Sequence, residues 1–274
     1  MTEPQRLGSL ARAFETAKRE RRGAFIPFLT SGFPDLLESD RLASALCEEG
    51  ADALELGVPF SDPVADGSII QRTTEAALRA GATLTHVLGQ AMRLRARHKT
   101  PIVLMTYLNP ILRYGSGRFA ADAASAGVDG VVLVDLPPEE EPGLWGSFRD
   151  AGIDTVALVA PTTEPTRLAR IARQASGFLY VVARLGVTGQ GTSDAAVDSI
   201  LARCREHTPL PRCLGFGMDL KTPLERYRGN AEGIVVGSAL LDSILAAPDA
   251  RSREENARQF ARNMRAKLPG LAPA

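Results

Sequence analysis

Short apolar runs alternate with amphipathic stretches along almost the whole chain. The runs are rich in Val, Ile and Leu, which favour β-strands, whereas the stretches between them have helical periodicity. Eight strands are predicted, at residues 24–30, 52–58, 101–107, 130–136, 154–160, 178–183, 211–216 and 233–237. Helices are predicted between them at about 36–49, 68–98, 117–126, 139–150, 165–175, 194–206 and 222–228, with a last helix at 251–267 and an extra one before the first strand at 5–20.

The same helix-to-strand junction occurs three times in the sequence. Residues 49–54 read Glu-Gly-Ala-Asp-Ala-Leu, and similar strings occur at 126–131 and 151–156. In each string a Gly able to take the left-handed conformation follows a helical stretch and precedes an apolar run. Regular alternation of strands and helices predicts parallel β-α-β units. We therefore expect an α/β fold, a (β/α)₈ TIM barrel with an extra N-terminal helix, forming one domain over residues 1–274.

Composition narrows the class of protein. Hydrophobic residues make up 45%, and Lys plus Arg equals Asp plus Glu at 32 each, so no nucleic-acid or membrane surface is indicated. Cys47, Cys204 and Cys213 are scattered and form no metal-binding pair. The first twenty residues are charged and amphipathic, unlike a signal peptide, and no apolar run is long enough to span a membrane. A cytoplasmic protein is expected.

Lysine and histidine positions argue against two kinds of catalysis. In such barrels the active site lies at the C-terminal ends of the strands. The four lysines, Lys18, Lys99, Lys221 and Lys267, fall on helices, before a strand or in a polar loop, so a Schiff-base lysine is not indicated. The histidines have no metal-ligand spacing. We expect neither imine chemistry nor a metal.

Glu55 is the unusual carboxylate of the chain. It interrupts an apolar strand in which Leu54 and Leu56 face the outer helices, so the alternation directs Glu55 into the barrel. Desolvation there would raise its pKa and suit it to general acid and base catalysis. The alternative is a structural carboxylate paired with an arginine. Asp66 follows in a Pro- and Gly-rich loop and could face the same cavity, or simply cap the helix that begins near Ser68.

Three glycine-rich turns near the end of the chain suggest a phosphate site. They are residues 186–189, 215–217 and 237–238, after the last three predicted strands. Glycines let backbone N–H groups approach a phosphate, and the loops after strands 7 and 8 commonly bind one. Phe28, Tyr107 and Tyr180 lie on or near strands and could wall a flat apolar substrate, although core packing explains each equally well.

These residues resemble one known family, the tryptophan synthase alpha subunit, over almost the whole chain. Its most specific segments are Leu54 to Gly67 (LELGVPFSDPVADG), Met105 to Pro110 (MTYLNP) and Gly186 to Gly189 (GVTG). The resemblance implies a carbon–carbon lyase that cleaves indole-3-glycerol phosphate to indole and glyceraldehyde 3-phosphate.

The resemblance also implies a role for individual residues. Glu55 matches the general acid and base, and Asp66 matches the carboxylate that binds the indole N–H. Phe28, Tyr107 and Tyr180 match positions lining the indole pocket; Gly189, Gly217, Gly237 and Ser238 match phosphate-binding positions; and Thr188 is expected to contact substrate.

The family docks on a beta subunit that carries pyridoxal phosphate (PLP), so an α₂β₂ assembly is expected and no cofactor is expected in this chain. Asp62 and Pro63 match positions implicated in communication with that partner. Two alternatives remain: a stand-alone lyase without a beta subunit, and a non-catalytic barrel that only binds a sugar phosphate or a partner. An isomerase of the histidine or tryptophan pathway is disfavoured by the segment from Glu55 to Asp66.

Overall fold

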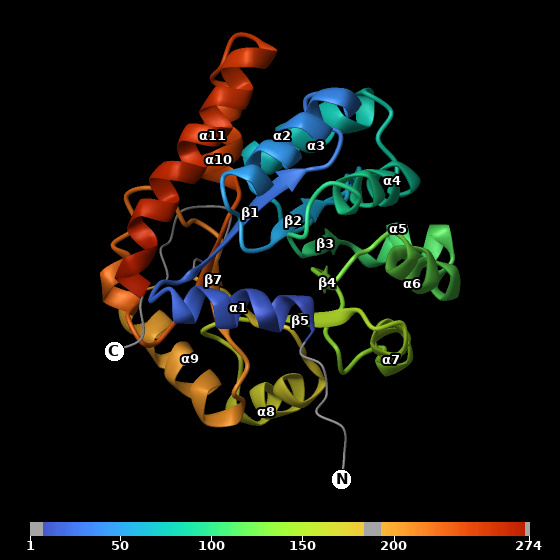
Figure 1. The fold of residues 1–274 in the computed structure, drawn as a ribbon. Helices are drawn as coiled ribbons and strands as arrows, with labels where there is room; N and C mark the ends of the chain where they lie inside the picture. The colour runs from blue at the N-terminus through green and yellow to red at the C-terminus, as the bar shows by residue number, and fades with distance from the viewer. Residues whose placement is uncertain (1–7, 184–192, 272–274) are drawn as a thin grey trace.

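Eight parallel strands form a closed barrel in the order of the sequence, so the predicted fold is confirmed (Figure 1). The structure is a computed structural model that describes residues 8–183 and 193–271. The last strand pairs with the first, Ala24 lying beside Gly233, which closes the barrel. The strands are β1 (Ala24–Thr30), β2 (Leu54–Gly57), β3 (Ile102–Thr106), β4 (Gly130–Leu133), β5 (Asp154–Val159), β6 (Leu179–Val182), β7 (Arg212–Gly215) and β8 (Gly233–Val236).

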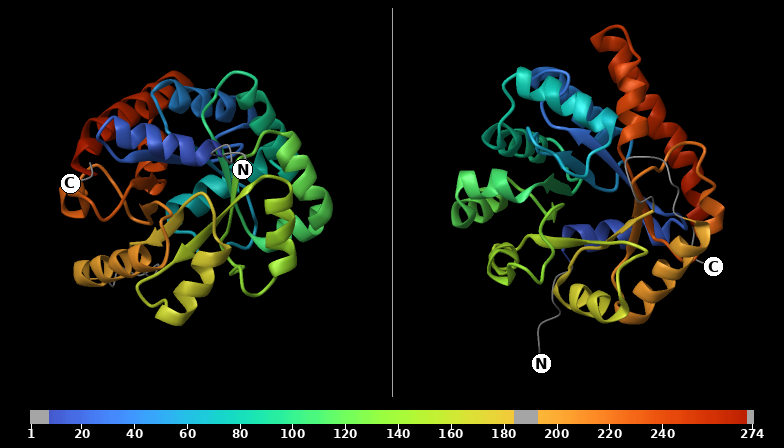
Figure 2. Two further views of the ribbon diagram at one scale, coloured as in Figure 1. Left: turned by 60° about the horizontal axis from the view of Figure 1, so that its bottom comes forward. Right: turned by 180° about the vertical axis from the view of Figure 1, so that it is seen from behind.

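Helices surround the barrel, and the views in Figure 2 show them as an outer layer. Apolar strand residues such as Leu54 and Leu56 are fully buried beneath this layer. The helices are α1 (Ser9–Arg19), α2 (Leu36–Glu48), α3 (Ser68–Arg79), α4 (Leu84–Arg95), α5 (Leu108–Tyr114), α6 (Ser116–Ser125), α7 (Pro142–Asp150), α8 (Pro165–Gln174), α9 (Asp194–His207), α10 (Ser238–Leu245) and α11 (Ala250–Lys267), with 3-10 turns η1 (Leu224–Tyr227) and η2 (Leu268–Leu271).

The prediction of one helix over 68–98 was wrong. The chain breaks there into α3 and α4, because Gly81 takes a φ of +87° and Thr83 then caps α4 by accepting the His86 N–H. A left-handed glycine ends a helix and a Thr side chain begins one, so a single continuous helix is impossible. The helix predicted at 222–228 is reduced to the 3-10 turn η1, while α5 and α10 were not predicted.

The repeated junction folds as its glycines indicate. Gly50, Gly127 and Gly152 all have φ between +76° and +86°. In two of the copies the following aspartate also fixes the neighbouring strand: Asp52 accepts the Phe25 N–H at 2.8 Å, and Asp129 accepts the Ile102 N–H at 2.9 Å. The repeat therefore positions strand beginnings, at the N-terminal end of the barrel.

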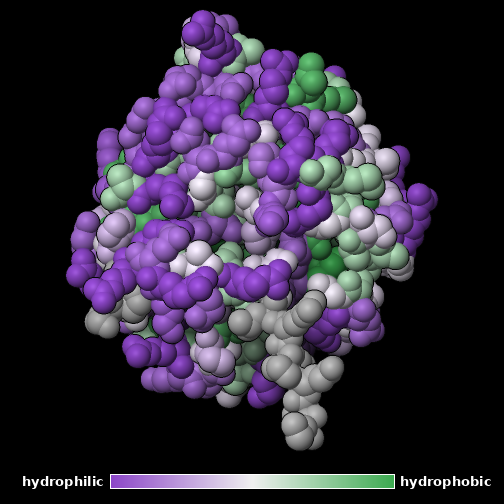
Figure 3. Space-filling model, viewed as in Figure 1, coloured by the Kyte–Doolittle hydropathy of each residue, from purple (hydrophilic) through white to green (hydrophobic). Residues whose placement is uncertain are grey.

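Helix α1 covers this N-terminal end of the barrel, and Figure 1 shows it crossing beneath the strands. Leu10 is fully buried and packs against Gly130 and Gly177, while the rings of Phe14 and Phe178 lie 5.7 Å apart. The outer face that α1 and α11 present is mainly hydrophilic (Figure 3). Within the described ranges, no helix has the length and apolar character needed to cross a bilayer.

Candidate active site

Glu55 lies inside the barrel on β2, as the alternation of that strand predicts. Only 1% of the residue is exposed. Its charge acts on Tyr180 of β6 and Cys213 of β7, which lie on other sides of the barrel. Neither carboxylate oxygen has a hydrogen-bond partner among the described residues, so the alternative of a structural pair with an arginine is not what the structure shows.

Burial sets the protonation state of Glu55. Desolvation penalises the charged form and raises the pKa of this carboxyl from 4.5 to about 8. The side chain therefore keeps its proton at neutral pH, which is the state that a general acid needs. A neutral carboxyl also explains how this group can remain without a partner inside an apolar barrel, since an unpaired buried charge would be far more costly.

Asp66 lies in the loop between β2 and α3, where the Tyr107 hydroxyl donates a hydrogen bond to its Oδ1 at 2.9 Å. The Tyr107 hydroxyl in turn accepts the Ala65 N–H at 3.2 Å, so two hydrogen bonds join the loop that carries Asp66 to Tyr107. Burial raises the pKa of Asp66, and the hydrogen bond from Tyr107 opposes that rise. Helix α3 has Gly67 at its N-cap with no side-chain cap, so Asp66 serves the cavity and not the helix end.

Phe28, Asp66 and Tyr107 meet around one small cavity at the C-terminal ends of β1, β2 and β3. Glu55 does not itself line this cavity, but it is the register partner of Phe28, which does. Five further residues, which no sequence pattern singled out as site residues, also line it: Thr30, Val58, Ile70, Thr74 and Met105.

The cavity is closed by its own aromatic rings. Its free volume is about 10 Å³, about that of one water molecule. The Phe28 ring packs on Gly57 so tightly that a Cβ there would lie 2.4 Å from the ring. Side chains must therefore move aside when a flat substrate enters.

Tyr180 packs on the opposite side of the barrel interior. A Cβ at Gly215 would lie 2.2 Å from the Tyr180 ring, and the Tyr180 and Phe216 rings lie 5.5 Å apart. Burial, Glu55 and Cys213 raise the pKa of Tyr180 well above its ordinary value, so its hydroxyl stays protonated. Tyr180 does not line the small cavity beside Asp66. It lies close enough to Glu55 for the charge of that carboxyl to raise the Tyr180 pKa.

The predicted phosphate positions lie at the C-terminal ends of β7 and β8. Gly217 has a φ of +86° in the turn after β7. Gly237 is the N-cap of α10 and Ser238 is its first residue, with no side-chain cap, so the first N–H groups of α10 are available to an anion. Gly237 also packs against Phe28, which links this helix end to the aromatic cavity. Thr188 and Gly189 lie outside the described residues.

Possible metal ligands and lysines have the following positions in the described part of the chain. No group of three or more His, Cys, Asp or Glu side chains is arranged to hold a metal ion there. Lys267 donates to the backbone oxygens of Leu220 and Thr222, outside the barrel interior. Glu55 and Asp66 are two buried carboxyls of the described barrel.

Known proteins resemble this chain over most of its length. The family model described as tryptophan synthase alpha chain matches residues 14–269. The tryptophan synthase alpha chain of Geobacter sulfurreducens is 46% identical over 236 residues, which are 86% of this chain and 89% of that one. That of Burkholderia pseudomallei is 42% identical over 268 residues, covering 97% and 98%.

Solved structures agree with the sequence matches. Tryptophan synthase subunit alpha from Legionella pneumophila superimposes with a TM-score of 0.86 at 33% identity, covering 96% of this chain and 99% of that one. A chain of Mycobacterium tuberculosis tryptophan synthase gives a TM-score of 0.87 at 32% identity, with coverage of 96% and 99%. The likeness extends over essentially the whole barrel.

Proposed function

The chain belongs to the tryptophan synthase alpha chain family of lyases, and from this premise we propose that Glu55 and Asp66 cleave indole-3-glycerol phosphate to indole and glyceraldehyde 3-phosphate. The observation that carries the proposal is the buried, unpartnered carboxyl of Glu55, whose pKa burial raises to about 8. A protonated acid beside an aromatic cavity fits a reaction that begins with protonation of an indole ring.

The atoms and electrons of the cleavage balance with no group beyond the substrate and these two carboxyls. Glu55 gives its proton to the indole ring carbon that bears the glycerol phosphate, which makes the ring cationic. The carbon–carbon bond then breaks, its electron pair returns to the ring, and the hydroxyl carbon becomes the aldehyde. The hydroxyl proton goes to the Glu55 carboxylate, which regenerates the acid. The ring itself accepts the electrons, so neither a metal nor an imine is required.

Asp66 is suited to stabilise the cationic ring. Tyr107 donates to its Oδ1, and Oδ2 is free to accept a hydrogen bond from the indole N–H. A negative carboxylate held in a poorly solvated cavity interacts more strongly with developing positive charge than it would in water. The phosphate of the substrate would bind the N-terminus of α10 at Gly237 and Ser238, next to the Phe28 ring.

A tryptophan synthase beta subunit is the partner we propose, in an α₂β₂ assembly in which PLP belongs to the partner and this chain holds no cofactor. A groove of about 540 Å³ between α5 and α7, lined by Leu108, Leu112, Leu136 and Leu144, would take part in the contact. Leu112 is 57% exposed, which favours burial against another chain. The three cysteines are buried and unbridged, which fits a cytoplasmic location.

Indole release by purified chain tests the proposal. Glu55→Gln should lower kcat by about 10² to 10⁴-fold while glycerol 3-phosphate still binds. Glu206→Gln, which removes an exposed carboxylate on α9, should leave kcat unchanged. Unaltered activity of Glu55→Gln would overturn the role of Glu55. Adding a beta subunit should speed indole formation; an unaffected rate would favour the stand-alone lyase instead.

A further inference from the structure

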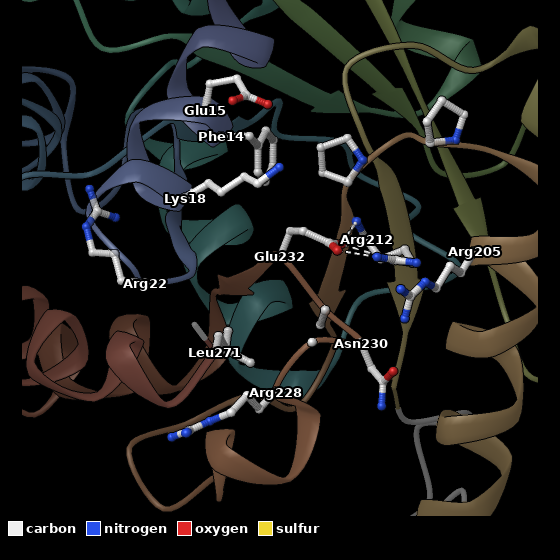
Figure 4. Close-up of a pocket in the computed structure, with 14 residues that line it drawn as sticks. Phe14, Glu15, Lys18, Arg22, Arg205, Arg212, Arg228, Asn230, Glu232 and Leu271 are labelled. Carbon is white, nitrogen blue, oxygen red and sulfur yellow. Dashed lines mark hydrogen bonds and ion pairs between the residues drawn. The ribbon is translucent and has the colours of Figure 1, made fainter. Parts of the chain in front are cut away.

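A second cavity lies at the opposite, N-terminal end of the barrel, between α1, the C-terminal end of α9 and the segment after η1. Its volume is about 490 Å³, within the range of small-molecule sites. Five basic and two acidic side chains line it: Lys18, Arg22, Arg205, Arg212, Arg228, Glu15 and Glu232 (Figure 4). Nothing in the proposed lyase reaction uses this cavity.

Two of the five cations are already neutralised. Arg22 binds Asp52 at 2.6 Å, and its side chain is only 9% exposed. Arg212 binds Glu232 through Nε and Nη2 and leaves Nη1 out of that pair. These two pairs are structural, because they fix the beginnings of β1 and β7 to neighbouring segments.

The other three cations lack such partners. Lys18 and Arg205 form no ion pair with any described residue, and Arg228 makes only a 3.4 Å contact to the backbone oxygen of Gly270. In Figure 4 the side chain of Arg205 extends toward Arg212, although both are cations. Lys18 and Arg205 each lie in the last turn of a helix, where a basic residue is favourable. The preference for a basic residue at a helix end does not explain why Lys18 and Arg205, on two different helices, both line one cavity.

We propose that this cavity binds a small phosphate-bearing molecule with at least two negative charges. The unpaired cations come from three separate segments; Lys18 and Arg205 extend into the cavity from α1 and α9, whereas the head of Arg228 points away from both (Figure 4). A tetrahedral oxyanion can accept hydrogen bonds from several directions at once, whereas a planar carboxylate is matched best by one arginine in its plane. The side-chain amide of Asn230 adds a further donor to the lining.

Inorganic pyrophosphate is the probe, titrated calorimetrically into the full chain; the Ser238→Asp variant, whose added negative charge disfavours an anion at the N-terminus of α10, shows how much of the heat comes from the active site. Wild type should bind pyrophosphate, and Arg205→Ala and Lys18→Ala should each weaken binding about tenfold. Arg97→Ala, which removes an exposed arginine at the end of α4, is the matched control and should bind as wild type does. Glu15→Gln should tighten binding several-fold, since it removes a lining negative charge.

The proposal is overturned if wild type does not bind pyrophosphate, or if Arg97→Ala weakens binding as much as the cavity variants do, which would show unspecific attraction. Citrate binding more tightly than pyrophosphate would overturn the phosphate assignment. Indole formation measured on the variants other than Ser238→Asp shows that each is folded, because none of their altered residues touches the active site.

Discussion

The buried carboxyl of Glu55 is expected to lower the stability of the folded protein as the pH rises, and Glu55→Gln should remove this effect. Burial raises the pKa of Glu55 from 4.5 to about 8, whereas the unfolded chain keeps the ordinary value. Between these values the folded protein holds a proton that the unfolded chain has lost. Its free energy of unfolding therefore falls by up to about 1.4 kcal/mol per pH unit, reaching about 3 kcal/mol at pH 7.

Urea unfolding between about pH 5 and pH 8 measures this effect. Glutamine has nearly the shape of the neutral carboxyl but does not titrate, so the variant should exceed wild type by about 1 kcal/mol near pH 5 and about 3 kcal/mol near pH 7. The exposed Glu206→Gln variant is the control, and its difference from wild type should stay flat. A Glu55→Gln difference that does not change with pH would refute the reasoning, because it would mean that the carboxyl is paired or solvated.

Three further substitutions probe the rest of the site. Tyr107→Phe removes the hydrogen bond that lowers the pKa of Asp66, so the acidic limb of kcat/KM should move to higher pH and its plateau should fall roughly tenfold; an unmoved limb contradicts this. Gly215→Ala drives a Cβ into the ring packed on it and should lower the urea-unfolding free energy by about 1 to 3 kcal/mol, whereas Gly117→Ala, in open space, should not. Ser238→Asp adds a negative charge where the phosphate should bind, so steady-state kinetics should show KM raised at least about tenfold with kcat nearly unchanged. An unaltered KM would mean that the phosphate does not bind at the N-terminus of α10.

The strands were predictable because each is a short apolar run between polar turns. Glu55 was the informative exception: alternation alone directed it inward, and the structure adds that no described residue pairs with its carboxyl. The helix break at Gly81 was hidden, because the amphipathic pattern continues on both sides of it and only the left-handed backbone reveals the turn. Helix α10 was missed since Gly237 and Ser238 read as a loop, although an uncapped helix start is what a phosphate site needs.

Contacts between residues that lie far apart in the sequence could not be predicted from it. Asp66 could have been a helix cap as easily as a cavity residue, and only the hydroxyl of Tyr107, which lies 41 positions away, decides the matter. The closed state of the aromatic cavity is equally invisible in the sequence, because it depends on how the Phe28 ring rests on Gly57. Side-chain volume and three-dimensional proximity set these features, and no local pattern encodes them.

The pairing of the first strand with the last has a consequence for synthesis on the ribosome. Ala24 cannot meet Gly233 until about 200 further residues have been made, which takes about 10 to 40 s at ordinary elongation rates. During that interval one edge of β1 keeps its N–H and C=O groups unpaired, as an aggregation-prone strand does. The nascent chain must therefore remain an open, incomplete sheet until its last strand emerges, and its vulnerability to misassociation is greatest before it is released.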